Sequence, residues 1–164
     1  MTEKPDATPS DETILTHSGR DPAHNRGYVN TPVYRGSTIV FPTLDDLESP
    51  GPRFDYGRTG NPSSAAVEDL ITELEGAAGT VLAPSGLSAI SLALMTVLNA
   101  GDEVLVTDSA YQPTRRVSDG VLARLGIAIR YYDPRIGAGI DALITDKTKA
   151  IFVESPGSLT FEVQ

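Results

Sequence analysis

Apolar residues follow two alternating patterns in the chain from residue 63 onward. Runs with apolar residues at helical spacing alternate with short runs that are almost continuously apolar. The expected helices are 63–76, 85–101, 113–126 and 140–148, and the expected strands are 80–84, 103–107, 127–133 and 150–155. Strands that alternate with helices predict an α/β fold of three layers (α/β/α), in which a mostly parallel sheet carries helices on both faces.

Residues at the ends of these runs predict where several helices begin or end. Ser64 is a candidate N-cap for the first helix, and Gly76 is a stop signal. The run 85–101 is apolar nearly all round, so we expect a buried helix, and Gly101 is expected to end it. Pro113 suits the first turn of the following helix.

The first 62 residues show a different pattern. Residues 1–11 are polar and predict a disordered leader, and a short helix is expected over 12–17, ended by Gly19. Residues 20–62 are rich in proline and glycine, which predicts an extended segment. A segment of this length is expected in a compact domain only where it is functional or lies on another chain. The predicted organisation is therefore an arm, 1–62, followed by the first part of an α/β domain, 63–164.

Composition narrows the possible partners. The chain of 164 residues is 40% hydrophobic and 21% charged, which is ordinary for a globular protein. Its formal net charge of −9 argues against nucleic acid and anionic membrane surfaces as partners. The absence of cysteine excludes disulfides, thiolate metal sites and a cysteine nucleophile. The polar start has no apolar signal core, so we expect a cytoplasmic protein with no membrane span.

Candidate chemistry lies after the expected strands, because ligands of parallel sheets bind beyond the carboxyl ends of their strands. Ser85, Gly86 and Leu87 follow the first expected strand and open a helix, whose free N–H groups suit a phosphate. The alternative is that Ser85 only caps the helix. Tyr111 follows the second expected strand, and it could stack on a flat ligand or pack its own loop. Glu154 lies at the end of the last expected strand, either as part of the same rim or as a solvated carboxylate.

The stretch 54–60, FDYGRTG, adds a phenol and a guanidinium on a permissive backbone. Arg58 suits bidentate recognition of a phosphate, and Tyr56 can donate one more hydrogen bond. The alternative is a surface loop with a rim salt bridge of little energetic value. Together with the rim residues, the loop predicts a pocket that binds a phosphate, stacks a ring and closes with an extended segment. No metal site is expected, since His17, His24 and the small acidic clusters are better explained as solvated side chains.

These motifs also carry a resemblance. The stretches YGRTGNPSSAAVEDLITELEGA, VLAPSGLSAISLALMTVLNAGDEVLVTDSAYQPTRR and FVESPGSLTFEV resemble the Cys/Met-metabolism enzymes that use pyridoxal 5′-phosphate (PLP), and among them the cystathionine β-lyase branch. The γ-lyases and γ-synthases of that family usually read E-[ST]-P-x-N-P in the last stretch, where this chain has no asparagine. The resemblance implies the large domain of PLP-dependent transferases (aspartate aminotransferase type, fold type I), present here incompletely, and a tetramer built from tight dimers.

Residue roles follow from the resemblance by motif. Gly86 and Leu87, with Ser85 beside them, would bind the cofactor phosphate, and Tyr111 would stack on the pyridine ring and help to move or orient a substrate proton. Tyr56 and Arg58 would reach the phosphate in the adjacent subunit. The implied substrate is a small sulfur amino acid, L-cystathionine, which would be cleaved to homocysteine, pyruvate and ammonia in methionine biosynthesis.

The chain lacks a lysine at the place where this chemistry needs one. Its lysines are Lys4, Lys147 and Lys149, none of which matches the family's cofactor lysine, expected beyond Gln164. We therefore expect an N-terminal part of a longer enzyme that is inactive alone. Two alternatives stay open: another reaction of the family, such as that of methionine γ-lyase or cystathionine γ-synthase, and a non-catalytic fragment that acts only by subunit association.

Overall fold

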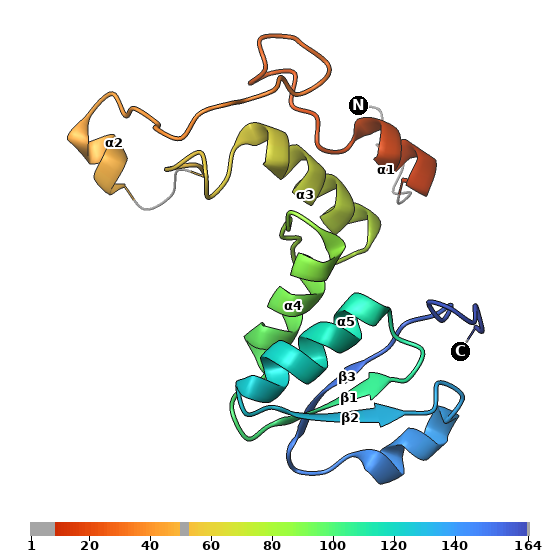
Figure 1. Ribbon diagram of the computed structural model, residues 1–164. Helices are drawn as coiled ribbons and strands as arrows, with labels where there is room; N and C mark the ends of the chain where they lie inside the picture. Colours follow the sequence, from red (N-terminus) through yellow and green to blue (C-terminus); the bar gives the residue numbers. More distant parts are fainter. Residues whose placement is uncertain (1–8, 50–52, 164) are drawn as a thin grey trace. The chain divides into compact units, whose positions relative to one another are not determined.

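The computed structural model describes residues 9–49 and 53–163 (Figure 1). The chain forms two compact units that divide between Leu82 and Ala83. The first unit therefore includes the helix that follows Pro62 as well as the expected arm. The predicted division at residue 62, with an arm that packs on a neighbouring subunit, stays a prediction.

The second unit is built on a parallel three-stranded sheet in the order β2-β1-β3. Strand β1 (Glu103–Thr107) lies in the centre and pairs in parallel with β2 (Ala128–Tyr132) and β3 (Thr148–Phe152). The central strand is apolar and nearly completely buried, as its continuous apolar run predicts. The expected parallel sheet is thus confirmed at all three of these strands, and their ends differ from the expected ones by no more than three residues.

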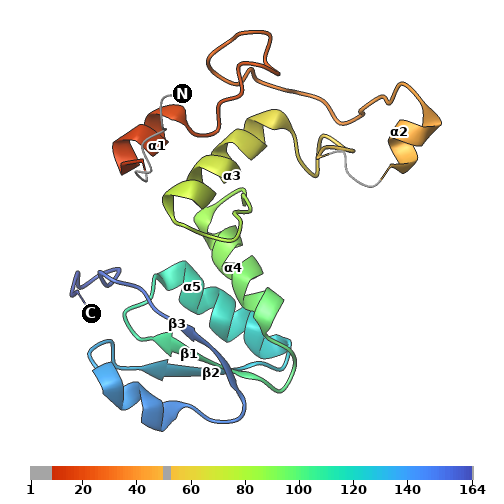
Figure 2. The ribbon, with the colours of Figure 1, turned by 180° about the vertical axis from the view of Figure 1, so that it is seen from behind.

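Helices pack on this sheet through one apolar cluster. Helix α4 (Gly86–Val97) precedes β1, and α5 (Gln112–Arg116) continues into a π-helical segment, η1 (Val117–Leu122), before β2. The buried cluster joins both helices to the sheet and contains Leu94, Leu98, Val104, Val106, Ala110, Leu122 and Ile127. Figures 1 and 2 show α5 on one side of the sheet and the 3₁₀ segment η2 (Gly137–Leu143) on the other.

Four expectations for this region are wrong in detail. Residues 80–84 form no strand: both ladders of β1 are already taken by β2 and β3, and Val81 is 89% exposed. Helix α4 ends at Val97 rather than at Gly101, because the chain becomes extended at Leu98. The same helix is buried on one side only, with Leu92 about half exposed. The expected helix 140–148 is a 3₁₀ segment that stops at Leu143.

In its described residues, the first unit contains three helices and little buried apolar surface. They are α1 (Asp11–His17), α2 (Leu44–Glu48) and α3 (Pro62–Leu74). The expected short helix is confirmed as α1. Of the predicted disordered leader, residues 1–8 lie outside the described residues, whereas Asp11 already belongs to α1.

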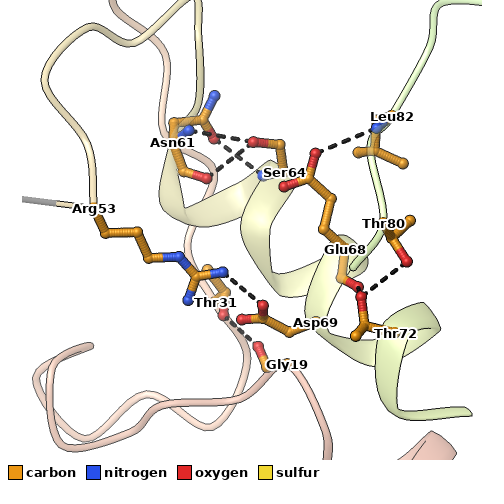
Figure 3. Close-up of polar contacts among 10 residues, drawn as sticks. All are labelled: Gly19, Thr31, Arg53, Asn61, Ser64, Glu68, Asp69, Thr72, Thr80 and Leu82. Atoms are coloured by element: carbon orange, nitrogen blue, oxygen red, sulfur yellow. Dashed lines mark hydrogen bonds and ion pairs between the residues drawn. The ribbon is translucent and has the colours of Figure 1, made fainter. Parts of the chain in front are cut away.

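The N-cap of α3 is Asn61. The apolar pattern had predicted Ser64 at this position, and that prediction is wrong. The Asn61 side chain accepts hydrogen bonds from the backbone N–H groups of Ser63 and Ser64. The Ser64 hydroxyl in turn accepts one from the Asn61 N–H, and Figure 3 shows the contacts between Asn61 and Ser64. Pro62 at the first helical position completes the start signal. Among the described helices, none is long and apolar enough to cross a membrane.

Candidate active site

The start of α4 presents backbone donors to solvent. The Ser85 hydroxyl accepts the Ser88 N–H at 3.1 Å, so the expected capping role of Ser85 is confirmed. The N–H groups of Gly86 and Leu87 have no hydrogen-bond acceptor in the described part of the chain. A Cβ built on Gly86 would meet no atom within 4 Å, so the space beside these amides is open. The helix start can therefore receive an anion at two amides while Ser85 occupies the third.

Tyr111 lies at the carboxyl end of β1, as the sequence predicts. It is the residue that precedes α5, its ring is half exposed, and its N–H points to both carboxylate oxygens of Glu154 at 3.1 Å. Glu154 follows β3, so one hydrogen bond joins the ends of two neighbouring strands. A second tie, from the Ser158 N–H to the Ser109 carbonyl, holds the same two loops together. The Tyr111 ring is thus fixed at the rim by its backbone and remains accessible.

Sequence reasoning missed a polar network beside this rim. The Arg115 guanidinium bonds to the Asp108 carboxylate at 2.6 Å and lies 4.0 Å from the centre of the Tyr131 ring. The Tyr131 hydroxyl donates to Asp119 at 2.8 Å. Burial, reinforced by the bond to Asp119, raises the pKa of Tyr131 to about 12, and the Asp108 bond raises the pKa of Arg115. Asp108 directly follows β1, and this was the signal available in the sequence.

The predicted loop residues belong to the first unit. Tyr56 forms an isolated antiparallel bridge with Thr38, and the Gly57 N–H bonds to the Ser37 carbonyl at 2.8 Å. A Cβ at Gly57 would collide with the Gly36 backbone, so this close approach requires glycine. Arg58 is exposed, and its guanidinium makes no ion pair within the described residues. Whether Tyr56 and Arg58 meet the phosphate site of another subunit stays a prediction.

The remaining candidates do not form a metal site in the structure. The His24 ring bonds to Asp21 at 2.6 Å, and both side chains are largely exposed. No group of three or more His, Asp or Glu side chains arranged for a metal occurs in residues 9–49 and 53–163. Lys147 and Lys149 lie at the amino end of β3, whereas Tyr111 lies beyond the carboxyl ends of the parallel strands.

Comparisons with known proteins agree on one family. The family model described as "Cys/Met metabolism PLP-dependent enzyme" matches residues 12–164. A Saccharomyces cerevisiae relative, whose cystathionine beta-lyase name is provisional, is 51% identical over 93% of this chain and 44% of its own length. The Escherichia coli protein named "Cystathionine beta-lyase MetC" is 35% identical over 93% of this chain and 40% of its own length. The chain thus spans less than half the length of these relatives.

Solved structures show the same relationship. A cystathionine gamma-lyase from Lactobacillus plantarum, solved with L-serine, has a TM-score of 0.85 and 33% identity, over 95% of this chain and 39% of its own. A Campylobacter jejuni structure that contains N′-pyridoxyl-lysine-5′-monophosphate has a TM-score of 0.85 and 25% identity, with coverages of 95% and 39%.

Proposed function

The chain belongs to the Cys/Met-metabolism PLP-dependent enzymes, and we propose that it forms the phosphate and ring site of a carbon–sulfur lyase of the cystathionine β-lyase type. The fold is that of PLP-dependent lyases of fold type I, of which the parallel sheet here is a part, and the cofactor is pyridoxal 5′-phosphate. The observation that carries the residue-level proposal is the pair of unpartnered amides at the start of α4.

The residues present fit this cofactor. A phosphate needs several directed donors, and the N–H groups of Gly86 and Leu87 supply two at the positive end of the α4 dipole. A pyridine ring needs an aromatic or apolar platform, and Tyr111 offers a half-exposed ring at the carboxyl ends of the strands. Ser85 contributes indirectly. Its hydroxyl accepts a hydrogen bond from the Ser88 N–H, and this bond fixes the first turn of α4, which carries the two free amides.

Each residue then has a physical task. When bound, the cofactor supplies an electron sink for the carbanion that forms at the substrate's Cα. Glu154 holds the Tyr111 backbone, so that the phenol stays over the ring site and can accept or deliver a proton at the substrate. Arg58 and Tyr56, which are exposed on the first unit, would add a guanidinium and a hydroxyl to the phosphate of a second copy. The exposed apolar residues of the first unit, such as Val33 and Val40, support such an association into dimers and tetramers.

The proposed reaction is the cleavage of L-cystathionine to homocysteine, pyruvate and ammonia, a step of methionine biosynthesis in the cytoplasm. The Escherichia coli relative and the ESPGSL stretch, which lacks the asparagine typical of γ-lyases, favour the β-lyase reaction. The γ-lyase reaction is the second candidate, favoured by the likeness to the Lactobacillus plantarum enzyme. Neither described lysine lies near Tyr111, so we propose that these 164 residues alone are inactive.

The phosphate site can be tested without turnover. Gly86→Pro removes one amide donor, and proline is well tolerated at the first position of a helix, whereas Gly86→Ala keeps the donor. A hydrogen bond to a charged group contributes about 1.5–3 kcal/mol. We therefore expect Gly86→Pro to weaken PLP binding by roughly tenfold or more relative to Gly86→Ala, measured by equilibrium dialysis. Equal affinity of the two variants would refute the assignment of the α4 amides.

The reaction can be assigned from its products. In a protein that combines these residues with the cofactor lysine, cleavage of L-cystathionine to pyruvate would support the β-lyase proposal, and 2-oxobutanoate would assign the γ-lyase reaction instead. The 164-residue chain should form neither product. Turnover by this chain alone would contradict the proposed role of a further lysine.

A further inference from the structure

A cavity lined only by residues of the first unit contains none of the residues proposed for the cofactor. Its volume is about 580 Å³, within the range of small-molecule sites. Four segments line it: the loop after α1, residues 31–34, residues 53–54 and the start of α3. Long-range contacts hold these segments together, among them the bond from the Thr31 hydroxyl to the Gly19 carbonyl at 3.1 Å (Figure 3).

The cavity is lined by balanced charges that are only partly paired. Arg53 bonds to Asp69 at 2.6 Å through a single guanidinium nitrogen, which leaves its other N–H groups and the second Asp69 oxygen without a partner among the described residues (Figure 3). The Asp21 carboxylate is already bonded to the His24 ring. Arg20 forms no ion pair or hydrogen bond through its side chain within the part of the chain that the structure describes.

A buried amide lines the same cavity with little of its hydrogen-bonding capacity used. Asn25 is only 6% exposed. Its side chain has two hydrogen bonds, to the Thr31 hydroxyl and from the Tyr34 hydroxyl, and both are 3.5 Å long. This length is at the limit for a hydrogen bond. A buried amide that is so weakly bonded is costly, so a polar ligand in the cavity would stabilise it.

We propose that this cavity binds a zwitterionic α-amino acid. Two arginines and two aspartates line it, so neither a simple anion nor a simple cation matches its charge. The unpaired Arg20 suits a carboxylate, and the unused oxygen of Asp69 suits an ammonium group. The rings of Tyr34 and Phe54 supply apolar wall for an aliphatic side chain. The inference does not depend on the proposed cofactor site, which uses none of these residues.

A matched set of ligands tests the charge requirement on the full chain. L-norleucine carries both charged groups, hexanoate lacks the ammonium, and pentylamine lacks the carboxylate, while the carbon chain is kept. Because a hydrogen bond to a charged group is worth about 1.5–3 kcal/mol, we expect L-norleucine to bind roughly tenfold or more tightly than either analogue, measured by ligand-observed NMR or calorimetry. Absence of L-norleucine binding, or equal binding of hexanoate, would overturn the proposal.

Substitutions then assign the two ends of the ligand. Arg20→Gln should weaken L-norleucine about tenfold or more, whereas Arg35→Gln, an exposed arginine of the same unit outside the cavity, should leave binding unchanged. Asp69→Asn should abolish the preference for L-norleucine over hexanoate, because it removes the partner of the ammonium. Circular dichroism of each variant verifies folding. If Arg20→Gln and Arg35→Gln bind alike in folded protein, the site is not where we place it. PLP binding should be unaffected by all three variants, so the two proposals fail separately.

Discussion

Each of the two units is stabilised internally by a different kind of interaction. In the second unit, nine hydrophobic residues are buried, and they gather on and around the central strand β1. In the first unit, only Ile14 and Ala65 are buried hydrophobic residues among those described. Its segments are joined instead by caps and by isolated polar contacts, such as the bond from the Tyr34 N–H to the Ser63 hydroxyl at 2.8 Å.

This difference shows which part of the chain has a core of its own. Burial of apolar surface dominates folding energy, at about 25 cal/mol per Å². Both units leave large apolar side chains exposed, for example Val33 in the first and Phe161 in the second, but among the described residues only the second unit gathers a set of fully buried apolar side chains. Substitutions should therefore have large effects in the sheet and moderate ones in the arm.

The largest effect is expected for Leu105→Ala at the centre of the sheet. Leu105 is fully buried, and truncation of a buried leucine leaves a cavity that typically costs about 2–5 kcal/mol. The free energy of unfolding of the full chain, measured with urea, should fall by this amount. Val81→Ala is the matched control, because Val81 is exposed and should change stability by less than about 0.5 kcal/mol. A similar loss in both variants would contradict the contrast between the units.

The elements that the sequence predicted well are those whose burial is decided locally. The run EVLVT is apolar on both faces, and it became the central strand β1. The run 80–84 looks similar in sequence, yet it forms no strand. Both sides of β1 pair with strands that lie later in the chain, β2 about 25 positions on and β3 about 45 positions on. The Asn61 cap was missed although Asn-Pro is itself a signal for the start of a helix. The prediction relied on the apolar positions of α3, and the first of these lies several residues after the first helical residue, Pro62.

The candidate site shows the same limit. The position of Tyr111 follows from the rule that loops after parallel strands meet at one edge, and the structure places it there. The network of Asp108, Arg115 and Tyr131 could not be predicted, because it depends on how α5 packs over β2. The proposed contact of Arg58 with a phosphate would involve a second chain, and sequence periodicity carries no information on such a contact.

The second prediction concerns pH and the Tyr131 hydroxyl. Its folded-state pKa of about 12 lies above the ordinary tyrosine value, chiefly because of burial. The stabilisation by neutral Tyr131 is therefore complete below about pH 10, the ordinary tyrosine pKa, and is lost as the pH rises through about 12. Since the shift is about two pKa units and one unit corresponds to about 1.4 kcal/mol, the loss is on the order of 3 kcal/mol.

Phenolate absorbance and urea unfolding across this pH range measure the effect. Tyr131→Phe should remove one late-ionising phenol and reduce the alkaline loss of stability, while Tyr132, whose pKa burial also raises, remains in the variant. Tyr28→Phe, at an exposed ring of the first unit, should leave both unchanged. If Tyr131→Phe retains the full late ionisation step, the Asp119 bond and the burial of this ring do not control it.

The third prediction tests the first unit through its helix cap. Asn61→Ala removes the acceptor of two N–H groups at the start of α3 and should destabilise the chain by about 1 kcal/mol. Asn61→Ser, which keeps a capping oxygen, is the control and should recover most of the loss in a thermal unfolding experiment. A loss of stability for Asn61→Ala as large as that for Leu105→Ala would show that the first unit contributes as much to the stability of the chain as the sheet does. This result would contradict the contrast between the two units.

The smallest effect is expected at the Arg53–Asp69 ion pair, although its 2.6 Å contact is short and it joins residues 16 positions apart (Figure 3). Both side chains are about half exposed, so water and salt screen the attraction, and such pairs contribute about 0.2–1 kcal/mol. A double-mutant cycle of Arg53→Gln and Asp69→Asn should give a coupling energy below about 1 kcal/mol, which decreases further at high salt. A salt-independent coupling of several kcal/mol would mean that the pair is shielded from solvent, and the arm would then have a buried polar core in place of its missing apolar one.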